Sequence, residues 1–431
     1  MTRVLRDDAS PIQSLELAIS EDEVADLRAR LRATRWPPEV DEVAGGRDPW
    51  AAGMPVSALR ELTADWAGFD WRSREQEMAA LPHVVVPTSD PAVSHIHAVH
   101  VRGTGPAPLP LVMTHGWPST FHEWHRVIGP LTDPAAHGGD PADAFHVVTP
   151  SLPGYGFSAA PTLPGVSPRR VAGIWVELMA ALGYDRFGAH GCDWGSFVTS
   201  LIGLDHPDRV VGVHMGMVSL GAPAEPGEAT EADAAYKARV RAWRRHEHGY
   251  VGIQGTKPAT LAAGLTDSPA GLAAWVGEKW STWSDRDEAG TPLVPREDLL
   301  TTLSLYWFTR TIGSANRLYY ESQRDPVVLA RGQRVEVPSG FLLETAGDQR
   351  ADGRNRGTAA VPRFGAPPRR RVERAFDVQR WTETTVGGHF PALETPELFV
   401  DEVRAFFRPL RQQAPREQAL RGPTRTTEGT A

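Results

Sequence analysis

The residues with the clearest capacity for chemistry are Asp193, Asp348 and His389. Asp193 stands at the centre of G-x-D-x-G (191–195), directly after a short buried-looking run at 186–190. A sharp turn from a strand into a helix strains its central residue, and flanking glycines remove the Cβ atoms that would collide. A carboxylate held there is a nucleophile that needs no activating base, and its attack on an electrophilic carbon leaves an ester. Alone, the motif is equally typical of a glycine-rich turn with a solvated carboxylate.

Two further groups supply the remaining steps of such a reaction. A neutral His389 would take a proton from water, and Asp348 would hold the imidazole in the productive tautomer. Each follows a predicted strand, at 339–346 and 379–385, and ligands bind at the carboxyl ends of the strands in a parallel sheet. The chain order of nucleophile, acid and histidine therefore predicts hydrolysis through a covalent ester.

A turn after another short apolar strand supplies hydrogen-bond donors. H-G-W-P at 115–118 follows the strand predicted at 109–114. Backbone N–H groups in such a turn point above the sheet, as does the N–H of the residue after the nucleophile. The N–H groups of Trp117 and Trp194 are therefore the candidates for an oxyanion hole.

The pattern of elements divides the chain into five parts. Short strands alternate with helices in 83–219 and 327–410, which is typical of a mostly parallel α/β sheet with helices on both faces. Helical periodicity dominates 220–326, and an insertion there would form a lid over the site. Residues 1–82 hold predicted helices from Ser20 and Val56 but no catalytic group, so we expect a helical arm packed on the core, weakly tethered over 1–12. The polar tail at 411–431 is expected to be disordered.

These motifs together resemble the epoxide hydrolases of the microsomal and juvenile-hormone type, over about residues 13–408. The shared motifs are H-G-W-P (115–118), G-C-D-W-G (191–195) and G-G-H-F (387–390), and segments of the arm such as T-R-W-P (34–37) and F-D-W-R (69–72). The resemblance implies an α/β-hydrolase fold with an N-terminal meander and a helical lid. No single motif is specific, but the combination is.

The resemblance also implies roles for residues outside the triad. G-Y-V-G-I-Q (249–254) and R-L-Y-Y-E (317–321) resemble the lid segments that carry the family's epoxide-activating tyrosines, so Tyr250 and Tyr319 are expected to hold the epoxide oxygen. A phenol remains protonated at neutral pH and can donate to the alkoxide that ring opening creates. His115, Pro118 and Phe390, within the shared motifs, are expected to line the substrate pocket.

Three assignments stay open at this point. Tyr320 is the alternative donor to Tyr319, since adjacent helical residues point about 100° apart and only one can face the site. The acid is Asp348, with Glu344 and Asp352 as alternatives, because the family often carries its carboxylate slightly further along, before a Pro-Pro segment that matches 367–368 here. Cys192, beside the nucleophile, is expected to pack as a small buried residue.

Two other functions compete with epoxide hydrolysis. A haloalkane dehalogenase shares the Asp nucleophile, but a leaving halide needs N–H donors such as indoles, not phenols. Trp117 and Trp194 could serve, yet the two lid tyrosines and the N-terminal arm argue against this activity. A non-catalytic protein that binds apolar ligands through the lid is disfavoured by an intact triad.

Composition sets the outer limits. The net charge of -8 argues against binding of nucleic acid, which requires a basic surface. The single cysteine among 431 residues excludes a disulfide framework and a multi-cysteine metal site. The microsomal relatives carry a membrane anchor, and we see neither a roughly 20-residue apolar span nor a signal-peptide core. We therefore expect a soluble, cytoplasmic enzyme without metal or cofactor, whose partners are an apolar epoxide and water; a homodimer is compatible with the sequence.

Overall fold

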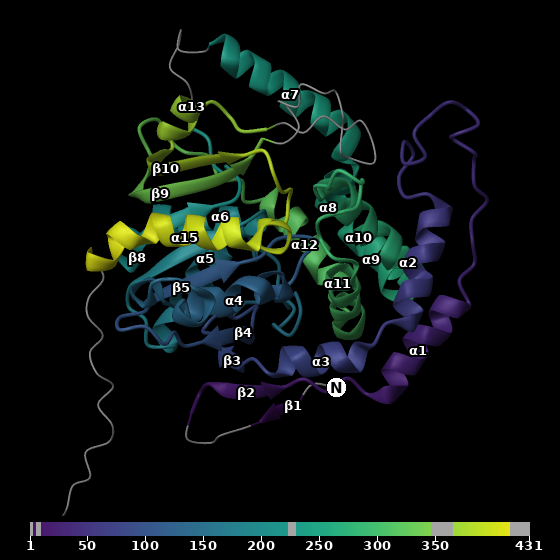
Figure 1. Ribbon diagram of the computed structural model, residues 1–431, viewed down its shortest axis with the longest axis horizontal. Coiled ribbons are helices and arrows are strands. Elements are labelled where there is room, and N and C mark those ends of the chain that lie inside the picture. The colour runs from purple at the N-terminus through teal and green to yellow at the C-terminus, as the bar shows by residue number, and fades with distance from the viewer. Residues whose placement is uncertain (1–2, 6–9, 223–229, 346–364, 414–431) are drawn as a thin grey trace, which may run out of the picture.

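A ten-stranded sheet organises the protein, seen in a computed structural model that describes residues 3–5, 10–222, 230–345 and 365–413. The strand order is β1-β2-β3-β4-β6-β5-β7-β8-β9-β10 (Figure 1). The strands are β1 (Arg3–Leu5), β2 (Gln13–Glu16), β3 (His83–Pro87), β4 (His95–Val101), β5 (Leu109–Thr114), β6 (Phe145–Pro150), β7 (Phe187–Gly191), β8 (Val210–Met215), β9 (Val335–Glu344) and β10 (Phe376–Thr384). Neighbours pair antiparallel from β1 to β6 and parallel from β6 to β10.

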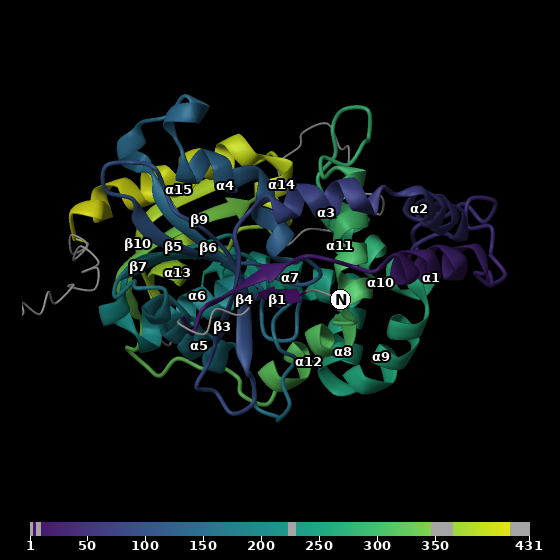
Figure 2. The same cartoon turned by 90° about the horizontal axis from the view of Figure 1, so that it is seen from below.

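The parallel half of the sheet is covered on both faces. Figure 2 shows α4 and α15 on one side and α5 and α6 on the other. These helices are α4 (His125–Thr132), α5 (Pro168–Ala181), α6 (Trp194–Asp205) and α15 (Pro396–Phe407). Every residue of β6, β7 and β8 is buried, as expected for strands sandwiched between helices. This is the mostly parallel α/β architecture that the sequence predicts.

The segment between β8 and β9 is helical, and it lies beside the sheet in Figure 1. Its helices are α7 (Glu231–Glu247), α8 (Gly249–Thr256), α9 (Pro258–Asp267), α10 (Pro269–Trp283), α11 (Arg296–Thr309) and α12 (Ile312–Ser322). The stretch 296–322 is helical by its sequence pattern, and the structure divides it into α11 and α12, because Arg310 adopts the left-handed conformation (φ 56°) and ends α11. The helix over 249–256 is not evident from sequence, since two glycines weaken its helical propensity.

The helices of the N-terminal arm pack on the lid helices, and its strand β2 pairs with β3 in the sheet. Its helices are α1 (Glu21–Arg32), α2 (Val56–Gly68) and α3 (Trp71–Ala79). The indole of Trp66 donates to Ser304 Oγ of α11 over 2.9 Å, and Trp71 packs on Phe308 of the same helix. Only β1 and β2 of the arm join the sheet, so 3–5 form a paired strand where a weakly tethered segment is predicted.

Short helices complete the described chain. They are η1 (Phe121–Trp124), η2 (Ala135–His137), η3 (Pro141–Asp143), η4 (Pro207–Arg209), α13 (Arg369–Glu373), α14 (Pro391–Glu394) and η5 (Arg408–Gln413). The predicted disordered tail falls almost entirely outside the described residues, which end at 413.

Candidate active site

Asp193 lies at the tip of a strained turn between β7 and α6. Its backbone has φ 51° and ψ −120°, a conformation that costs energy for a residue with a Cβ. The glycines on both sides make the turn possible. A Cβ on Gly191 would overlap the carbonyl oxygen of Gly195, and a Cβ on Gly195 would overlap that of Thr114. The packed turn therefore places the carboxylate at the carboxyl edge of the sheet.

Two backbone donors hold the Asp193 carboxyl group. The N–H of Trp117 donates to Oδ1 over 2.9 Å, and the N–H of Trp194 also hydrogen-bonds to this carboxyl. Burial raises the pKa of Asp193 to about 6, against the lowering effect of those two hydrogen bonds. Both predicted oxyanion-hole donors thus hydrogen-bond to the carboxyl group of the predicted nucleophile, and this group remains largely ionised at neutral pH.

His389 follows β10 and faces the second oxygen of that carboxyl. Its Nε2 lies 3.9 Å from Asp193 Oδ2. The loop that carries it is held by the end of α10. The N–H of His389 donates to the carbonyl oxygen of Trp283 over 3.0 Å, and the N–H of Gly387 donates to Asp285 Oδ2 over 3.1 Å. The lid thus positions the histidine.

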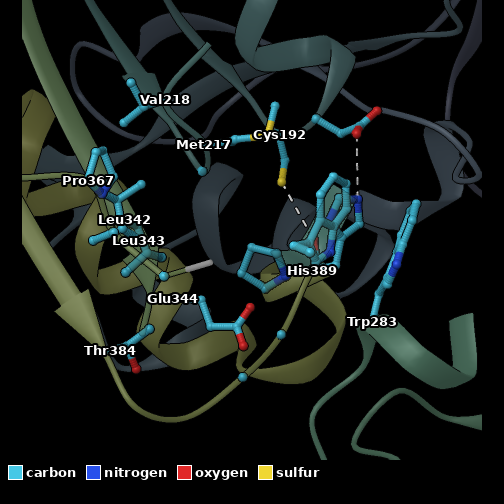
Figure 3. A pocket seen from close by; sticks show the side chains of 18 of the residues that line it. Cys192, Met217, Val218, Trp283, Leu342, Leu343, Glu344, Pro367, Thr384 and His389 are labelled. Carbon is cyan, nitrogen blue, oxygen red and sulfur yellow. Dashed lines mark hydrogen bonds and ion pairs between the residues drawn. The ribbon is translucent and has the colours of Figure 1, made fainter. Parts of the chain in front are cut away.

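The acid of the triad is the least defined member. Asp348 and Asp352 lie outside the described residues. Glu344, the last residue of β9, lines the same cavity as His389. Figure 3 shows its carboxylate beside the imidazole ring. Among the three carboxylates considered from the sequence, Glu344 is thus the one that the structure places near the histidine.

The two predicted tyrosines meet above the nucleophile. Tyr250 on α8 stacks on the indole of Trp117 at 5.0 Å between ring centroids, and Tyr319 on α12 packs edge-on against Trp194 at 4.6 Å. The rings of Tyr250 and Tyr319 are 5.7 Å apart. Burial, with the charges around them, raises the pKa of both hydroxyls well above the ordinary value, so both stay protonated.

Tyr320 lies elsewhere. The guanidinium of Arg324 sits 3.2 Å from the centroid of its ring and also donates to the carbonyl oxygen of Tyr320. Of the adjacent pair, Tyr319 is therefore the residue that the structure brings together with Asp193.

A cavity of about 200 Å³ opens onto Asp193 and His389 (Figure 3). Most of its wall is apolar or aromatic, which suits an uncharged organic ligand. Its lining includes Met217, Val218, Tyr236, Trp243, Tyr250, Trp283, Leu342, Leu343, Pro367 and Val386, together with the carboxylates of Glu247 and Glu344.

The three residues expected to line the pocket are not among those lining this cavity. His115 accepts a hydrogen bond from the N–H of Leu152 and is fully buried. Pro118 and Phe390 both meet Trp280: the indole donates to the Pro118 carbonyl oxygen, and the Phe390 ring stacks at 4.5 Å. Their contacts are thus with Leu152 and with the lid residue Trp280 rather than with the cavity.

Sequence reasoning missed the charged layer of the lid beside the cavity. Glu247 at the end of α7 accepts from Lys279 Nζ at 2.8 Å and from the indole of Trp283 at 3.3 Å. The Trp283 ring in turn packs on His389 at 4.7 Å between centroids. No local motif marks these residues; a buried-looking Lys279 within an apolar helical stretch (269–283) is the one available signal.

One group of side chains has ligand atoms suited to a cation. Atoms of His122, His125 and Asp298 all lie within 4.8 Å of one another. They sit between η1, α4 and the lid helix α11, and Arg126 already pairs with Asp298 at 3.1 Å. The guanidinium supplies the positive charge that this carboxylate needs, so the geometry does not call for a metal.

In the part of the chain that the structure describes, no helix is both long and apolar enough to cross a membrane.

The sheet, the turn at Asp193 and the loop at His389 define an α/β-hydrolase whose nucleophile position carries a carboxylate. Family models agree: "Epoxide hydrolase N terminus" matches residues 12–124, and "alpha/beta hydrolase fold" matches residues 110–246. Epoxide hydrolase 1 of Sus scrofa is 31% identical over 93% of this chain and 90% of its own length. The chain therefore belongs to the epoxide hydrolase family, and the protein is a hydrolase of the class that acts on ether bonds.

Further relatives support this assignment. The juvenile hormone epoxide hydrolase of Bombyx mori is 30% identical over 91% of this chain and 85% of its own length. The structure of Aspergillus niger epoxide hydrolase superposes with a TM-score of 0.76 at 26% identity, covering 92% of this chain and 96% of that one. The crystal structure of the Bombyx mori enzyme gives 0.73 at 27% identity, covering 93% and 94%. The predicted family and fold class are confirmed.

Proposed function

We propose that this epoxide hydrolase converts an apolar epoxide to a vicinal diol through an ester on Asp193. One observation carries the assignment of the nucleophile. Oδ1 of Asp193 is held by the N–H of Trp117, whereas Oδ2 lies 3.9 Å from His389 Nε2 and borders the cavity. The two oxygens are thus differentiated, one for charge stabilisation and one for attack.

In the first step, Oδ2 attacks a ring carbon of the epoxide. The C–O bond breaks with its electron pair on the epoxide oxygen, which takes a proton from Tyr250 or Tyr319. Their buried, protonated hydroxyls support this role. The products are a β-hydroxy ester on Asp193 and a tyrosinate.

In the second step, His389 takes a proton from water, and the hydroxide attacks the ester carbonyl carbon of Asp193. The negative charge develops on Oδ1, where the N–H groups of Trp117 and Trp194 can stabilise it. The tetrahedral intermediate collapses as the Cγ–Oδ2 bond breaks. Oδ2 leaves with the diol and takes the proton of the hydroxyl that water added, which regenerates the Asp193 carboxylate. The proton on the imidazole returns to the tyrosinate through solvent. A carboxylate at the end of β9 or after it stabilises the imidazolium. Asp348 is the residue predicted from the sequence, and the position of Glu344 beside the imidazole supports Glu344 as the alternative.

The halide-releasing alternative is disfavoured by a specific contact. The indole N–H of Trp117 donates to Asn316 Oδ1 over 3.0 Å, within a fully buried pair. A halide site would need that donor free. The non-catalytic alternative is disfavoured because Asp193, His389 and the hydroxyl donor Tyr250 line one cavity.

The covalent ester is the step to test first. His389→Gln should stall hydrolysis, so a single turnover with an aryl epoxide should raise the intact protein mass by the mass of the epoxide. Peptide mapping should place the adduct on Asp193, and Asp193→Asn should abolish it. A folded protein that gives no adduct across a broad epoxide panel, but turns over chloroalkanes, would refute the assignment.

A cytoplasmic location and a homodimer remain proposals. Fractionation of the native host and light scattering of the purified protein would test them; a membrane-bound fraction or a monomeric mass would contradict the respective expectation.

A further inference from the structure

A second hollow, lined by residues of α7 and α13, adjoins the active-site cavity. This groove, of about 390 Å³, shares three lining residues with the cavity: Val218, Tyr236 and Pro367. In Figure 3, Val218 and Pro367 stand on the side of the cavity away from Trp283. A long ligand with one end at Asp193 could therefore extend past these two residues into the groove.

The groove is strongly basic. Lys237, Arg241 and Arg244 of α7 and Arg371 of α13 line it, and its lining contains no acidic side chain. Ion pairs with described carboxylates are found for neither the three α7 cations nor Arg371.

Neighbouring arginines behave differently. On α13, Arg370 pairs with Asp233 at 2.7 Å and Arg369 pairs with Glu373 at 2.8 Å. The cations that line the groove thus have no described carboxylate as an ion-pair partner, on a protein whose net charge is -8.

The register of α7 sets a distance scale. Glu247 lies at the catalytic end, where it contacts Trp283. With a rise of 1.5 Å per residue, Arg244, Arg241 and Lys237 lie roughly 4.5, 9 and 15 Å further along the helix axis. Tyr236 and Val240 supply apolar surface over the same length. An apolar wall that leads to a row of cations matches an apolar chain that ends in an anion.

We propose that the groove binds the carboxylate of a long-chain epoxy acid whose epoxide reaches Asp193. Guanidinium groups suit a carboxylate because their planar N–H donors match its two oxygens. The proposal rests on the proposed epoxide hydrolysis and adds its substrate class: amphipathic epoxides with a free acid at the far end of an apolar chain.

The test compares one epoxide in two forms, a mid-chain epoxide of an 18-carbon fatty acid as the free acid and as its methyl ester, both below the micelle concentration. For Arg241→Gln/Arg244→Gln, we expect KM for the acid to rise about tenfold with kcat and the ester constants unchanged, since an ion pair with an exposed arginine adds only a modest free energy. Added salt should raise KM for the free acid and leave KM for the methyl ester unchanged. Arg369→Gln, which removes a cation outside the groove, is the matched control.

The outcomes separate this proposal from the catalytic one. If the double variant loses activity on the free acid and on the methyl ester equally, the proposed carboxylate site is wrong, while the assignment as an epoxide hydrolase stands. If it loses activity only on ester in vesicles of anionic lipid, the cations bind a lipid surface and the proposal is also wrong. If the wild-type protein hydrolyses neither form nor any other epoxide, the catalytic proposal fails first.

Discussion

The backbone N–H of His389 donates a hydrogen bond to the carbonyl oxygen of Trp283 over 3.0 Å, and the two rings pack with 4.7 Å between centroids. Trp283 is the last residue of α10, in the lid, whereas His389 follows the last strand of the sheet. The histidine is therefore positioned by the lid as well as by its own loop.

Replacing Trp283 should slow the step that uses the histidine. For Trp283→Ala we expect kcat to fall about tenfold, because the imidazole loses the ring that holds its orientation. A tenfold loss corresponds to about 1.4 kcal/mol of activation free energy. The rate of ester formation in a single turnover should change little. Trp283→Phe keeps an aromatic ring but loses the hydrogen bond to Glu247, so it should retain most activity. Equal losses in both steps would contradict this role.

The two lid tyrosines should act in ester formation. Tyr250→Phe and Tyr319→Phe should each slow it by about 10²-fold, since a positioned proton donor contributes at least that much. Tyr320→Phe is the matched control, because its ring lies under Arg324 and should leave the rate unchanged. Rapid-quench measurement of adduct formation in the His389→Gln background checks all three. If only Tyr320→Phe slowed ester formation, Tyr320 rather than Tyr319 would be the proton donor.

The pH dependence of ester formation should report the nucleophile. Burial raises the pKa of Asp193 to about 6, and only the ionised carboxylate attacks. The single-turnover rate in the His389→Gln background should therefore be constant above that pH and fall about tenfold per unit below it. A midpoint near 4 would mean that water screens the carboxylate more than its packing indicates.

The acid of the triad can be identified by separate substitutions. If Asp348 holds the imidazole, Asp348→Asn should slow ester hydrolysis by about 10²-fold or more, as loss of a triad carboxylate does elsewhere, while Glu344→Gln should have a small effect. The reverse result would assign Glu344, whose carboxylate lies beside the ring. Asp352→Asn completes the set. Accumulation of the ester by mass spectrometry is the readout, and ester formation should be unaffected.

The turn at Asp193 should tolerate no side chain at Gly195. Because a Cβ there would overlap the Thr114 carbonyl oxygen, Gly195→Ala should lower the free energy of unfolding by about 1–3 kcal/mol. Gly173 in α5 has open space around its Cα, so Gly173→Ala should raise stability by about 0.5–1 kcal/mol. Urea unfolding of both variants makes the comparison; equal effects would mean that the turn relaxes.

The sequence predicts the parts of the site that are local. The turn at Asp193 and the donor Trp117 follow from glycine spacing and apolar strands, because both depend on residues within one strand–turn–helix unit. Contacts between residues far apart in the chain cannot be predicted from such local patterns. The support of His389 by Trp283 joins residues 106 positions apart, and Glu247 becomes part of the cavity only when α7 packs. The acid stays unresolved for the same reason, since no local pattern separates Glu344 from Asp348.

Cys192 lines the cavity next to Asp193, and its thiol donates to the carbonyl oxygen of His389 at 3.5 Å. Burial, and then the nearby carboxylates, raise its pKa well above the ordinary value. Epoxides alkylate thiolates irreversibly, whereas the ester on Asp193 can be hydrolysed. By keeping this sulfur protonated, the packing around Asp193 should limit irreversible alkylation of Cys192 by an epoxide.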